Sequence, residues 1–406
     1  MSVTRVQESS YKRIKRLREP SDTAESNKFK VAKYNQVATN VDVAQPPCDP
    51  IAQITFNARN QSILSITHLK EPLKLQTKYP IPEILPHEIL VNNKAIGLNP
   101  IDWKGKKYGF GIYHFPWING RESSGDIVKI GSQVKEGLRI GDKVILSSTC
   151  YRDNRTSTFQ QYTAIDSRLV WKLPQNFTYE DGATIGVGLV TAGVLLYNSF
   201  GFKLESKPKP KPKPCKNGTL LVWGGATIVG IYVTQLAKLN GLRVISVAST
   251  KHERYLKEIG VDELVNRHLQ IEEIQKQVYN AAPNGIDFGI DCVSKETSVK
   301  VLSLLDENHK KLAKHKTKSL FAGIVGVPRE VPSSVELKEV VIKRFHEDVA
   351  FGAKFIEATT SFLDNRLIKP ARYKQYKGGL EIIDDALKDL ETMGANGEKY
   401  VVSIQE

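Results

Sequence analysis

The sequence predicts an α/β protein in which a mostly-β region precedes a doubly wound parallel sheet. The first observation behind this prediction lies between residues 51 and 171. Short apolar runs alternate there with turns rich in Gly and Asp, as at 88–91 and 143–146. Because runs and turns of this kind are typical of short strands joined by tight connections, the region is expected to be mostly β.

The second observation is a change of pattern after residue 181. From there on, helical runs alternate with apolar strands at residues 220–223, 244–247 and 286–290. Since parallel strands are usually joined by helical crossovers, this alternation predicts a parallel sheet with helices on both faces. The end of the chain is expected to form a strand, a helix over 378–391 and a last strand over 400–404.

Length and composition favour a folded intracellular protein of two domains. The chain has 406 residues, and 40% of them are hydrophobic, which is enough for two sizeable cores. No long uninterrupted apolar run occurs, and the first residues have no apolar stretch of the kind that a secretory signal needs. The expected location is therefore the cytoplasm, with reduced thiols at the four scattered cysteines, Cys48, Cys150, Cys215 and Cys292.

The net charge of +14 is concentrated in three short segments, 1–33, 207–216 and 310–318. Such blocks are usually solvated, and no aromatic residues interleave with the lysines of the last two, so specific nucleic-acid binding is not expected. We interpret residues 1–45 as a basic, disordered tail. Its run YKRIKRLR leaves three alternatives open: a flexible arm, a peripheral contact with an anionic membrane, or a mitochondrial targeting signal, which Glu8 and Glu19 disfavour.

A strand, a glycine-rich turn and a helix form the strongest local signal. The strand 219–223 is followed by GGATIVG and then by a helical run over 231–239. Small residues let the backbone approach a pyrophosphate, while free N–H groups and the positive end of the helix dipole face its charge. The candidate cofactor-binding residues are Gly224, Gly225, Ala226, Thr227, Ile228, Val229 and Gly230.

Two other interpretations of this turn were weighed. A P-loop is disfavoured, because Ile231 and Tyr232 stand where a lysine and a hydroxyl residue are needed. An ordinary tight turn without a ligand is the other alternative, and the residues after the next strand argue against it.

Those residues also indicate which cofactor binds. The strand 242–248 ends in Ser249, Thr250 and Lys251, where an NAD-specific site tends to place a carboxylate for the ribose 2′-hydroxyl. Ser249 and Lys251 would instead hydrogen-bond and neutralise a 2′-phosphate, which favours NADPH. The alternative is that Ser249 or Thr250 only caps the next helix.

Three motifs upstream of the glycine turn add to these features: AIGLNPIDWK at 95–104, GRESSG at 120–125 and GDKV at 141–144. Together they resemble the medium-chain dehydrogenase/reductase superfamily, especially its zinc-free quinone oxidoreductase and enoyl reductase branch. Residues 148–160 look like a segment of fungal zinc-free members, and GEKYVV at 397–402 is similar to the family's closing strand. The resemblance covers roughly residues 50–406.

The resemblance implies a GroES-like, mostly-β catalytic domain and a Rossmann domain for the cofactor. The expected boundaries are 46–182 with 350–406 for the catalytic domain, and 183–349 for the NADP-binding domain. Within the latter, the Lys-Pro repeat at 207–216 is expected to be an extended loop, because each proline removes a donor and restricts the residue before it. Relatives are commonly dimers, so a homodimer is a further expectation.

The resemblance also implies that zinc is absent. Zinc alcohol dehydrogenases hold the catalytic metal partly through a cysteine near the first motif and a histidine in Gly-His-Glu, where this chain has Asn99 and Arg121. Neither an amide nor a guanidinium is a reasonable zinc ligand, and the scattered cysteines do not suit a four-thiolate cluster. Without a Lewis acid, hydrogen bonds must polarise the substrate, which suits quinones and conjugated enones.

Further site residues are expected near the nicotinamide. Asn99 and Asp102 are expected to shape the nicotinamide pocket, although Asn-Pro also initiates turns. By resemblance Thr191 lies near the nicotinamide, although a helical threonine can bond its own preceding turn. Tyr108 is a candidate proton donor, with packing as the alternative because its spacing departs from that of related reductases. Cys292 is interpreted as a buried thiol. Three residues that follow parallel strands should line the crevice: Val293, Gly323 and Val325.

The sequence thus predicts an NADPH-dependent oxidoreductase that passes a hydride to a small electrophile, such as a quinone, an enone or another carbonyl compound. The alternative is a catalytically weak or inactive, membrane-associated sorting adaptor, because fungal relatives include proteins linked to membrane-protein sorting. Two features support that alternative: the basic tail, and Thr227, which stands where many relatives have glycine and would crowd a pyrophosphate. No motif in the sequence identifies the substrate.

Overall fold

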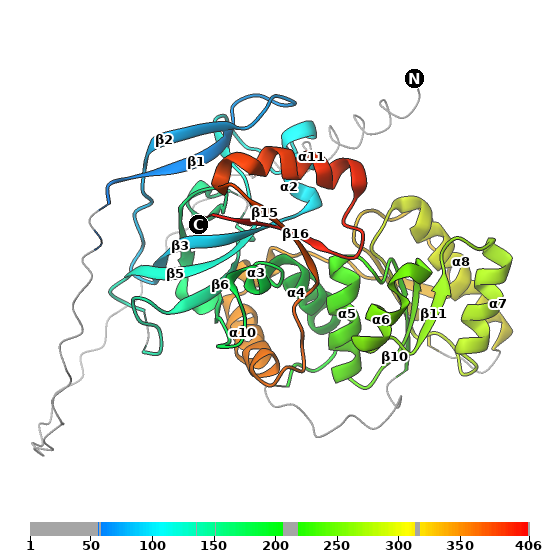
Figure 1. Cartoon of the computed structure of the whole chain (residues 1–406). Coiled ribbons are helices and arrows are strands. Elements are labelled where there is room, and N and C mark those ends of the chain that lie inside the picture. The colour runs from blue at the N-terminus through cyan, green and yellow to red at the C-terminus, as the bar shows by residue number, and fades with distance from the viewer. Residues whose placement is uncertain are drawn as a thin grey trace, which may run out of the picture. The chain divides into compact units, whose positions relative to one another are not determined.

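The computed structural model describes residues 56, 58–134, 136–150, 152–205, 218–312 and 317–404 (Figure 1). The tail at 1–45, the Lys-Pro segment at 207–216, Cys48 and Cys215 lie outside these residues, so what the sequence predicts for them is not tested.

Two sheets make up the mostly-β part. One has the strand order β2-β1-β4, and the other has the order β15-β16-β3-β5-β6-β8, with β7 paired to β3. The strands are β1 (Asn60–Ile66), β2 (Lys74–Pro80), β3 (Glu88–Leu98), β4 (Trp117–Ile118), β5 (Glu122–Ile130), β6 (Lys143–Ser147), β7 (Tyr162–Asp166), β8 (Val170–Lys172), β15 (Tyr373–Lys377) and β16 (Lys399–Ser403). The C-terminal strand β16 therefore lies beside β3, where Tyr400 is paired with Leu98. This pairing places the last described strand beside a strand from the first part of the chain.

The second part is a six-stranded, fully parallel sheet, as the alternation of helices and strands predicts. Its order is β11-β10-β9-β12-β13-β14. The strands are β9 (Thr219–Trp223), β10 (Arg243–Ala248), β11 (Glu263–Asn266), β12 (Phe288–Asp291), β13 (Ser319–Gly323) and β14 (Val335–Leu337). The strand order changes direction between β9 and β12, and ligands of such sheets bind at that switch point, outside the carboxyl ends of the strands.

Alternating side chains of β9 explain why helices cover both faces of the parallel sheet. Leu220 and Val222 pack into one buried cluster with Ile231 of α5, whereas Leu221 and Trp223 belong to a second cluster with helices α7 and α8. Successive side chains of a strand point to opposite faces, so a strand buried on both faces is apolar throughout. The helices concerned are α5 (Ile228–Leu239), α6 (Glu253–Glu258), α7 (Ile271–Ala281) and α8 (Lys295–Lys311).

The remaining helices pack around the mostly-β part or connect it to the parallel sheet. They are α2 (Pro100–Tyr108), α3 (Tyr179–Gly182), α4 (Gly186–Gly193), α9 (Arg344–Glu347), α10 (Val349–Asp364) and α11 (Ile383–Met393). In place of one helix over 378–391, the chain forms a 3-10 turn over Gly379–Ile382 and then α11. Helix α11 lies beside α2, to which it is joined by the ion pairs Lys106–Asp384 and Lys107–Glu391 (Figure 1).

One helical stretch, Tyr179–Ser199, is long and apolar enough to cross a membrane by length and composition. It comprises α3, α4 and the π-helical turn Val194–Ser199. Inside the molecule, 78% of its most apolar window is buried. Its apolar character is therefore that of a core helix packed between the two parts of the molecule.

Helix α5 is fastened to the segment that leads back to the mostly-β part. The Tyr232 hydroxyl donates to the carbonyl of Thr184 at 3.1 Å and accepts from the backbone N–H of Ala371 at 3.1 Å. The Gln235 amide makes a reciprocal pair with the backbone of Lys369, at 3.1 and 2.7 Å. The helix that begins at the glycine turn therefore also fixes the chain at residues 369–371.

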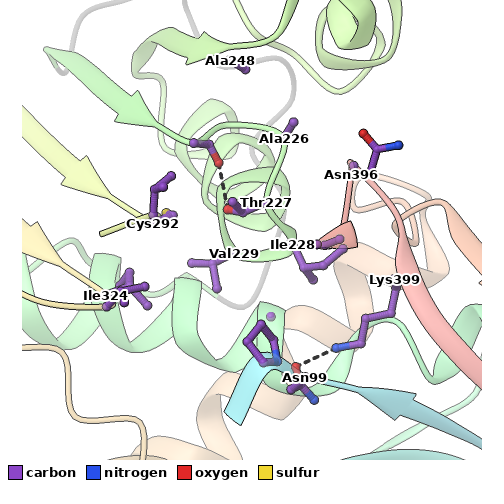
Figure 2. A pocket seen from close by; sticks show the side chains of 18 of the residues that line it. Asn99, Ala226, Thr227, Ile228, Val229, Ala248, Cys292, Ile324, Asn396 and Lys399 are labelled. Carbon is purple, nitrogen blue, oxygen red and sulfur yellow. Dashed lines mark hydrogen bonds between the residues drawn. The ribbon is translucent and has the colours of Figure 1, made fainter. Parts of the chain in front are cut away.

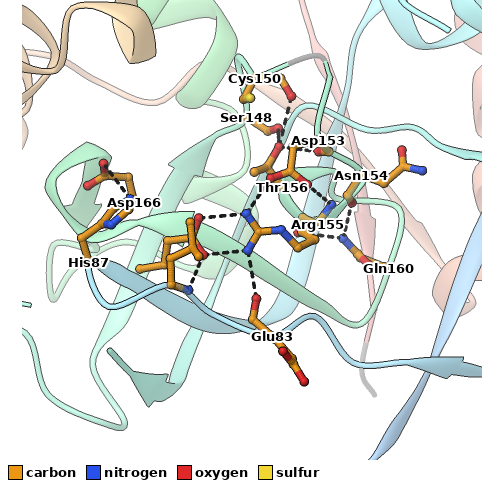
Figure 3. Close-up of polar contacts among 12 residues, drawn as sticks. Glu83, His87, Ser148, Cys150, Asp153, Asn154, Arg155, Thr156, Gln160 and Asp166 are labelled. Carbon is orange, nitrogen blue, oxygen red and sulfur yellow. Dashed lines mark hydrogen bonds and ion pairs between the residues drawn. The ribbon is translucent and has the colours of Figure 1, made fainter. Parts of the chain in front are cut away.

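The segment 148–160 is held by a polar network around Arg155 (Figure 3). The guanidinium donates to both carboxylate oxygens of Glu88, at 2.8 and 3.2 Å, and to Asp153 at 2.7 Å. The Gln160 amide nitrogen donates to backbone carbonyls of the same segment, the shortest contact being 2.6 Å to Ser157. Bidentate pairs of this kind fix geometry, so the network anchors the segment to the start of β3.

Candidate functional site

A pocket of about 1180 Å³ lies between the parallel sheet and the mostly-β part (Figure 2). On one side it is lined by the turn after β9, the end of β10 and the residues after β12 and β13. The opposite side comes from the end of β3, helices α2 and α4, and the loop that joins α11 to β16. The pocket opens at the carboxyl ends of β9, β10 and β12, which is where the switch-point rule places a ligand.

The glycine turn supplies one wall of the pocket. Five of its seven candidate residues line the pocket: Gly224, Ala226, Thr227, Ile228 and Val229. Gly225 and Gly230 do not. A Cβ atom on Gly225 would lie 1.9 Å from Oγ of Ser246, and one on Gly230 would lie 2.5 Å from the carbonyl oxygen of Gly224. These two glycines therefore allow the strand, the turn and the helix to pack closely. They shape the pocket only indirectly, because they hold the residues that line it in place.

Thr227 is the N-cap of α5. Its hydroxyl accepts from the N–H of Gly230 at 3.1 Å and donates to the carbonyl of Gly224 at 2.8 Å. Such a cap stabilises the turn and leaves the first N–H groups of the helix directed toward the pocket end. The hydroxyl is turned back into the helix start, so the expected crowding of a pyrophosphate by Thr227 loses its basis, and with it one argument for an adaptor.

Polar and cationic side chains gather where β10 and β11 end. Ser249 and Lys251 line the pocket, and the Lys251 ammonium donates to the side-chain oxygen of Asn396. Arg267 and His268, which follow β11, line it too, and sequence reasoning missed them. Because β10 and β11 are parallel neighbours, their ends must meet at one edge of the sheet; extending the argument from 249–251 to the next strand would have found both.

His252 adjoins this group. Burial lowers the pKa of its imidazole, and the positive charges of Lys251, Arg267 and Arg372 lower it further. A Cβ atom on Gly397 would lie 2.7 Å from the imidazole, so the loop after α11 passes directly over this residue. Near neutral pH the imidazole is therefore mostly uncharged in the free protein.

The other end of the pocket is mostly apolar. Its lining includes Ile101, Phe110, Val187, Ile324 and Ile342. Thr191 lines it as well, and its hydroxyl donates to the carbonyl of Val187 in the preceding turn at 2.7 Å, so its role toward a cofactor stays a prediction. An apolar end with few polar groups is suited to a planar, weakly polar reactant.

The residues after β12 and β13 divide into two groups. Val293 and Val325 line the pocket and are 39% and 49% exposed. Gly323 does not line it, because its α-carbon faces Val327, whose Cγ1 would lie 2.7 Å from an added Cβ. Cys292 also lines the pocket but is 8% exposed, and burial raises the pKa of its thiol to about 12, so it is a buried thiol, as predicted.

Tyr108 is not brought to the pocket. It lies at the C-terminal end of α2, is 49% exposed, and has its ring 6.3 Å from that of Trp103. Among the residues that the structure describes, Tyr108 is not one of those that line the pocket. Its surroundings match the packing alternative.

A cluster of charged and polar side chains is buried beside the apolar end of the pocket. The Lys399 ammonium donates to Oδ1 of Asn99 at 2.7 Å (Figure 2), and it is also paired with Oε1 of Glu122. The Asn99 amide nitrogen donates to the same Glu122 oxygen at 2.6 Å, and the other Glu122 oxygen accepts from the N–H of Val187 at 2.9 Å. Lys399 is 2% exposed and Glu122 is 0% exposed. Lys399 and Asn99 line the pocket, whereas Glu122 stands behind them.

Two more charged groups adjoin the cluster. Asp102 is completely buried and accepts from the N–H of Asn99 at 2.8 Å. Burial raises the pKa of this carboxyl to about 7, while the positive charges of Arg121 and Lys399 act against the increase. Arg121 is itself 2% exposed.

This donor set does not fit a catalytic zinc ion. The Asn99 amide is engaged with Lys399 and Glu122, Arg121 is a cation, and the Glu122 carboxylate is already neutralised by Lys399. Among the residues that the structure describes, no three His, Cys, Asp or Glu side chains come together as a metal site. Two cations stand where a metal would need anionic or neutral ligands.

Two family models match the chain. Residues 85–175 match the alcohol dehydrogenase GroES-like domain. Residues 229–310 match the domain described as zinc-binding dehydrogenase. The two matches fall on the mostly-β part and on the parallel sheet, respectively.

Individual proteins match over most of the chain. An uncharacterized protein of Saccharomyces cerevisiae, YLR460C, is 30% identical over 358 residues, which are 79% of this chain and 92% of that protein. The trans-enoyl reductase pvhC of Talaromyces variabilis is 28% identical over 343 residues, covering 79% and 91% of the two chains. A mycobacterial protein solved in complex with NADPH shares the fold, with a TM-score of 0.67 at 22% identity over 85% of this chain and 100% of that one.

Proposed function

Because the chain belongs to the medium-chain dehydrogenase/reductase superfamily, in its enoyl reductase and quinone oxidoreductase-like branch, we propose that this oxidoreductase is zinc-independent and uses NADPH to reduce a small conjugated electrophile. Quinones, enones and related carbonyl compounds are the proposed acceptors. The observation that carries the proposal is one continuous pocket, with a glycine turn, a helix start and a cationic group at one end and mostly apolar side chains at the other.

The preference for NADPH rests on the side chains after β10 and β11. Ser249, Lys251, Arg267 and His268 offer a hydroxyl, two cations and an imidazole, and none of them is a carboxylate. A 2′-phosphate would gain charge-assisted hydrogen bonds there, and the acidic residue that holds a ribose 2′-hydroxyl in NAD-specific sites has no counterpart among these four.

The residues of the chain prepare the reaction in three ways. The N–H groups at the start of α5 bind and orient the pyrophosphate of the cofactor. Ile101, Val187 and Ile324 exclude water from the chamber in which the reactants meet. When bound, the reduced nicotinamide supplies a hydride, and a substrate with an electron-poor carbon conjugated to a carbonyl can accept it without a metal.

We also propose a cytoplasmic location for the protein, since the apolar stretch Tyr179–Ser199 is accounted for as a core helix. A homodimer stays a prediction that light scattering of the purified protein would test.

The experiment that tests the proposed function is a titration of purified protein with NADPH and with NADH, followed by tryptophan fluorescence. Trp223 lines the pocket and is 4% exposed, so an occupied pocket should change its emission. We expect saturable NADPH binding and NADH binding at least about tenfold weaker, a gap of about 1.4 kcal/mol. Absence of saturable binding of either nucleotide would refute the proposal.

Two variants sharpen this test. Lys251→Ala and Arg267→Ala should weaken NADPH binding and leave NADH binding nearly unchanged, because only NADPH carries the 2′-phosphate. Lys257→Ala is the matched control, since this lysine lies on α6 and bonds the carbonyl of Asp262 outside the pocket. Equal weakening of both nucleotides would mean that the two cations act elsewhere than on the 2′-phosphate.

A further inference from the structure

The position of the Lys399 ammonium is unusual for a lysine. Its side chain is buried, yet it forms part of the pocket wall beside Asn99 (Figure 2). A buried charge is costly unless it is paired, and Glu122 pairs it from behind the wall. The Lys399 ammonium therefore faces the pocket, whereas the Glu122 carboxylate that pairs with it does not.

The hydrogen bonds of Lys399 leave it able to bind a ligand. An ammonium has three N–H donors. Among the described residues, its hydrogen-bond and ion-pair partners are Oδ1 of Asn99 and Oε1 of Glu122, and neither can occupy a third donor. A ligand oxygen in the apolar chamber would complete the set.

Of the two residues that hold this ammonium, Asn99 stands at an expected place of a metal ligand. The other, Glu122, directly follows Arg121, which stands at the second such place. An ammonium and a zinc ion share one capacity, which is to stabilise negative charge on an oxygen. The site thus replaces a bound cation with a cation of the chain itself.

We propose that Lys399 is a catalytic residue that binds the carbonyl oxygen of the substrate and donates a proton to it, with Glu122 and Asn99 as positioning residues. This inference rests on the proposed function, because it requires a substrate that accepts a hydride. It narrows the substrate class to acceptors whose electron-poor carbon is conjugated to a carbonyl oxygen.

The step balances as follows for an enone. The hydride brings two electrons and forms a new C–H bond at the β-carbon, and the C=C electron pair moves so that negative charge develops on the carbonyl oxygen. The N–H bond of Lys399 breaks, its proton passes to that oxygen, and the neutral amine later recovers a proton from water. The enol becomes the saturated ketone, so the substrate is reduced by two electrons and the nicotinamide is oxidised by two.

Two other roles would also explain a buried lysine here: binding a phosphate of the cofactor, or holding the fold only. The variant Lys399→Met leaves the Glu122 carboxylate buried without its cation, which is strongly destabilising. The double variant Lys399→Met/Glu122→Gln avoids that problem because it removes both charges. Lys374→Met is the matched control, since this lysine lies on β15, the strand next to β16, and is paired with Asp389 outside the pocket.

The measurements are NADPH affinity and kcat for two acceptors, a weakly activated enone and a strongly electron-poor quinone. A better acceptor reaches an earlier transition state with less charge on oxygen, so it depends less on the ammonium. For the double variant we expect unchanged NADPH affinity and a loss in kcat of about 100-fold with the enone, but a much smaller loss with the quinone. Lys399→Arg should restore part of the enone rate, and Lys374→Met should match the wild type.

If the double variant loses kcat equally with both acceptors, the inference is overturned. It is also overturned if kcat is retained while NADPH binds more weakly, a result that would indicate that Lys399 contacts a phosphate of the cofactor. Should wild-type protein fail to bind NADPH, the proposed function itself would fall, which is a different result.

A second measurement needs no folded variant of Lys399. The probe is 4-nitrophenol, whose yellow phenolate mimics an oxygen carrying negative charge. Added to wild-type protein saturated with oxidised cofactor, at a pH where the free probe is mostly the neutral phenol, it should bind as the phenolate. Binding as the neutral phenol, or no binding, counts against an ammonium that faces the substrate oxygen.

Discussion

At the scale of single residues, Asp102 makes the stability of the protein depend on pH. Burial raises its pKa from the ordinary value of 3.8 to about 7. Between these two values, the folded state keeps a proton that the unfolded state has released. The contribution of this carboxyl to stability is therefore greatest below about pH 4, falls as the pH rises, and becomes constant above about pH 7.

The variant Asp102→Asn should remove this dependence of the free energy of unfolding on pH. The asparagine side chain can still accept from the N–H of Asn99, which bonds Asp102 at 2.8 Å, but it does not titrate. Relative to the wild type, we expect the free energy of unfolding of the variant to gain a few kcal/mol between about pH 4 and pH 7, measured by urea denaturation at several pH values. Asp364→Asn, at an exposed carboxyl, is the control. Parallel curves for Asp102→Asn and the wild type would show that Asp102 is ionised throughout.

At the scale of elements, the junction of the glycine turn with β10 depends on the absence of a side chain at Gly225. A Cβ atom there would lie 1.9 Å from Oγ of Ser246, a buried hydroxyl that has no hydrogen-bond partner among the described residues. Gly225→Ala should therefore destabilise the protein by about 1–3 kcal/mol through overpacking. Ser246→Ala should cost little, because it removes a buried polar atom that makes no bond.

The double variant Gly225→Ala/Ser246→Ala should recover part of the loss, because the closest clash is with the hydroxyl that Ser246→Ala removes. Chemical denaturation of the four proteins gives the coupling energy. If the two changes simply add, the clash with Ser246 is not what requires glycine at this position.

The same elements show what the sequence could predict. The parallel sheet and the glycine turn were predicted because each signal is contiguous: an apolar strand, small residues and a helix within about twenty residues. Helix α5 begins at Ile228, three residues before the predicted 231, because Thr227 caps it, and such ends depend on hydrogen bonds that a periodicity does not contain.

The cluster around Lys399 could not be found in this way. Asn99 and Lys399 are 300 positions apart in the sequence, and they meet because the late strand β16 pairs with the early strand β3. Residues 397–402 were identified only as a closing strand, so the lysine within them had no assigned partner. The pairing of strands distant in sequence is a tertiary event, and local patterns do not determine it.

At the scale of the whole molecule, α5 joins the cofactor pocket to both parts of the fold. Its first turn lines the pocket, and Tyr232 and Gln235 hold residues 369–371, which lead back to β15 and β16. We therefore expect the two parts to unfold in one transition. NADPH at a concentration of 100 times Kd should increase the free energy of unfolding of both parts together, by about 2.7 kcal/mol.

Differential scanning calorimetry with and without NADPH tests this expectation. Two transitions, of which NADPH raises only one, would mean that α5 does not couple the two parts. The variant Gln235→Leu, which removes the bonds to Lys369 and leaves the pocket lining intact, should broaden or split the transition.

The contact between Lys251 and Asn396 has a consequence for the speed of binding. It links the residues after β10 to the loop between α11 and β16, and both of its members line the pocket. Lys251 must leave Asn396 before it can bind a phosphate of the cofactor. Entry of the cofactor should therefore include an opening step, which makes the association rate constant smaller than the diffusion limit. In stopped-flow fluorescence, Asn396→Ala should bind NADPH faster than the wild type, while the dissociation rate should stay nearly unchanged, because the pair is already separated once the phosphate holds Lys251.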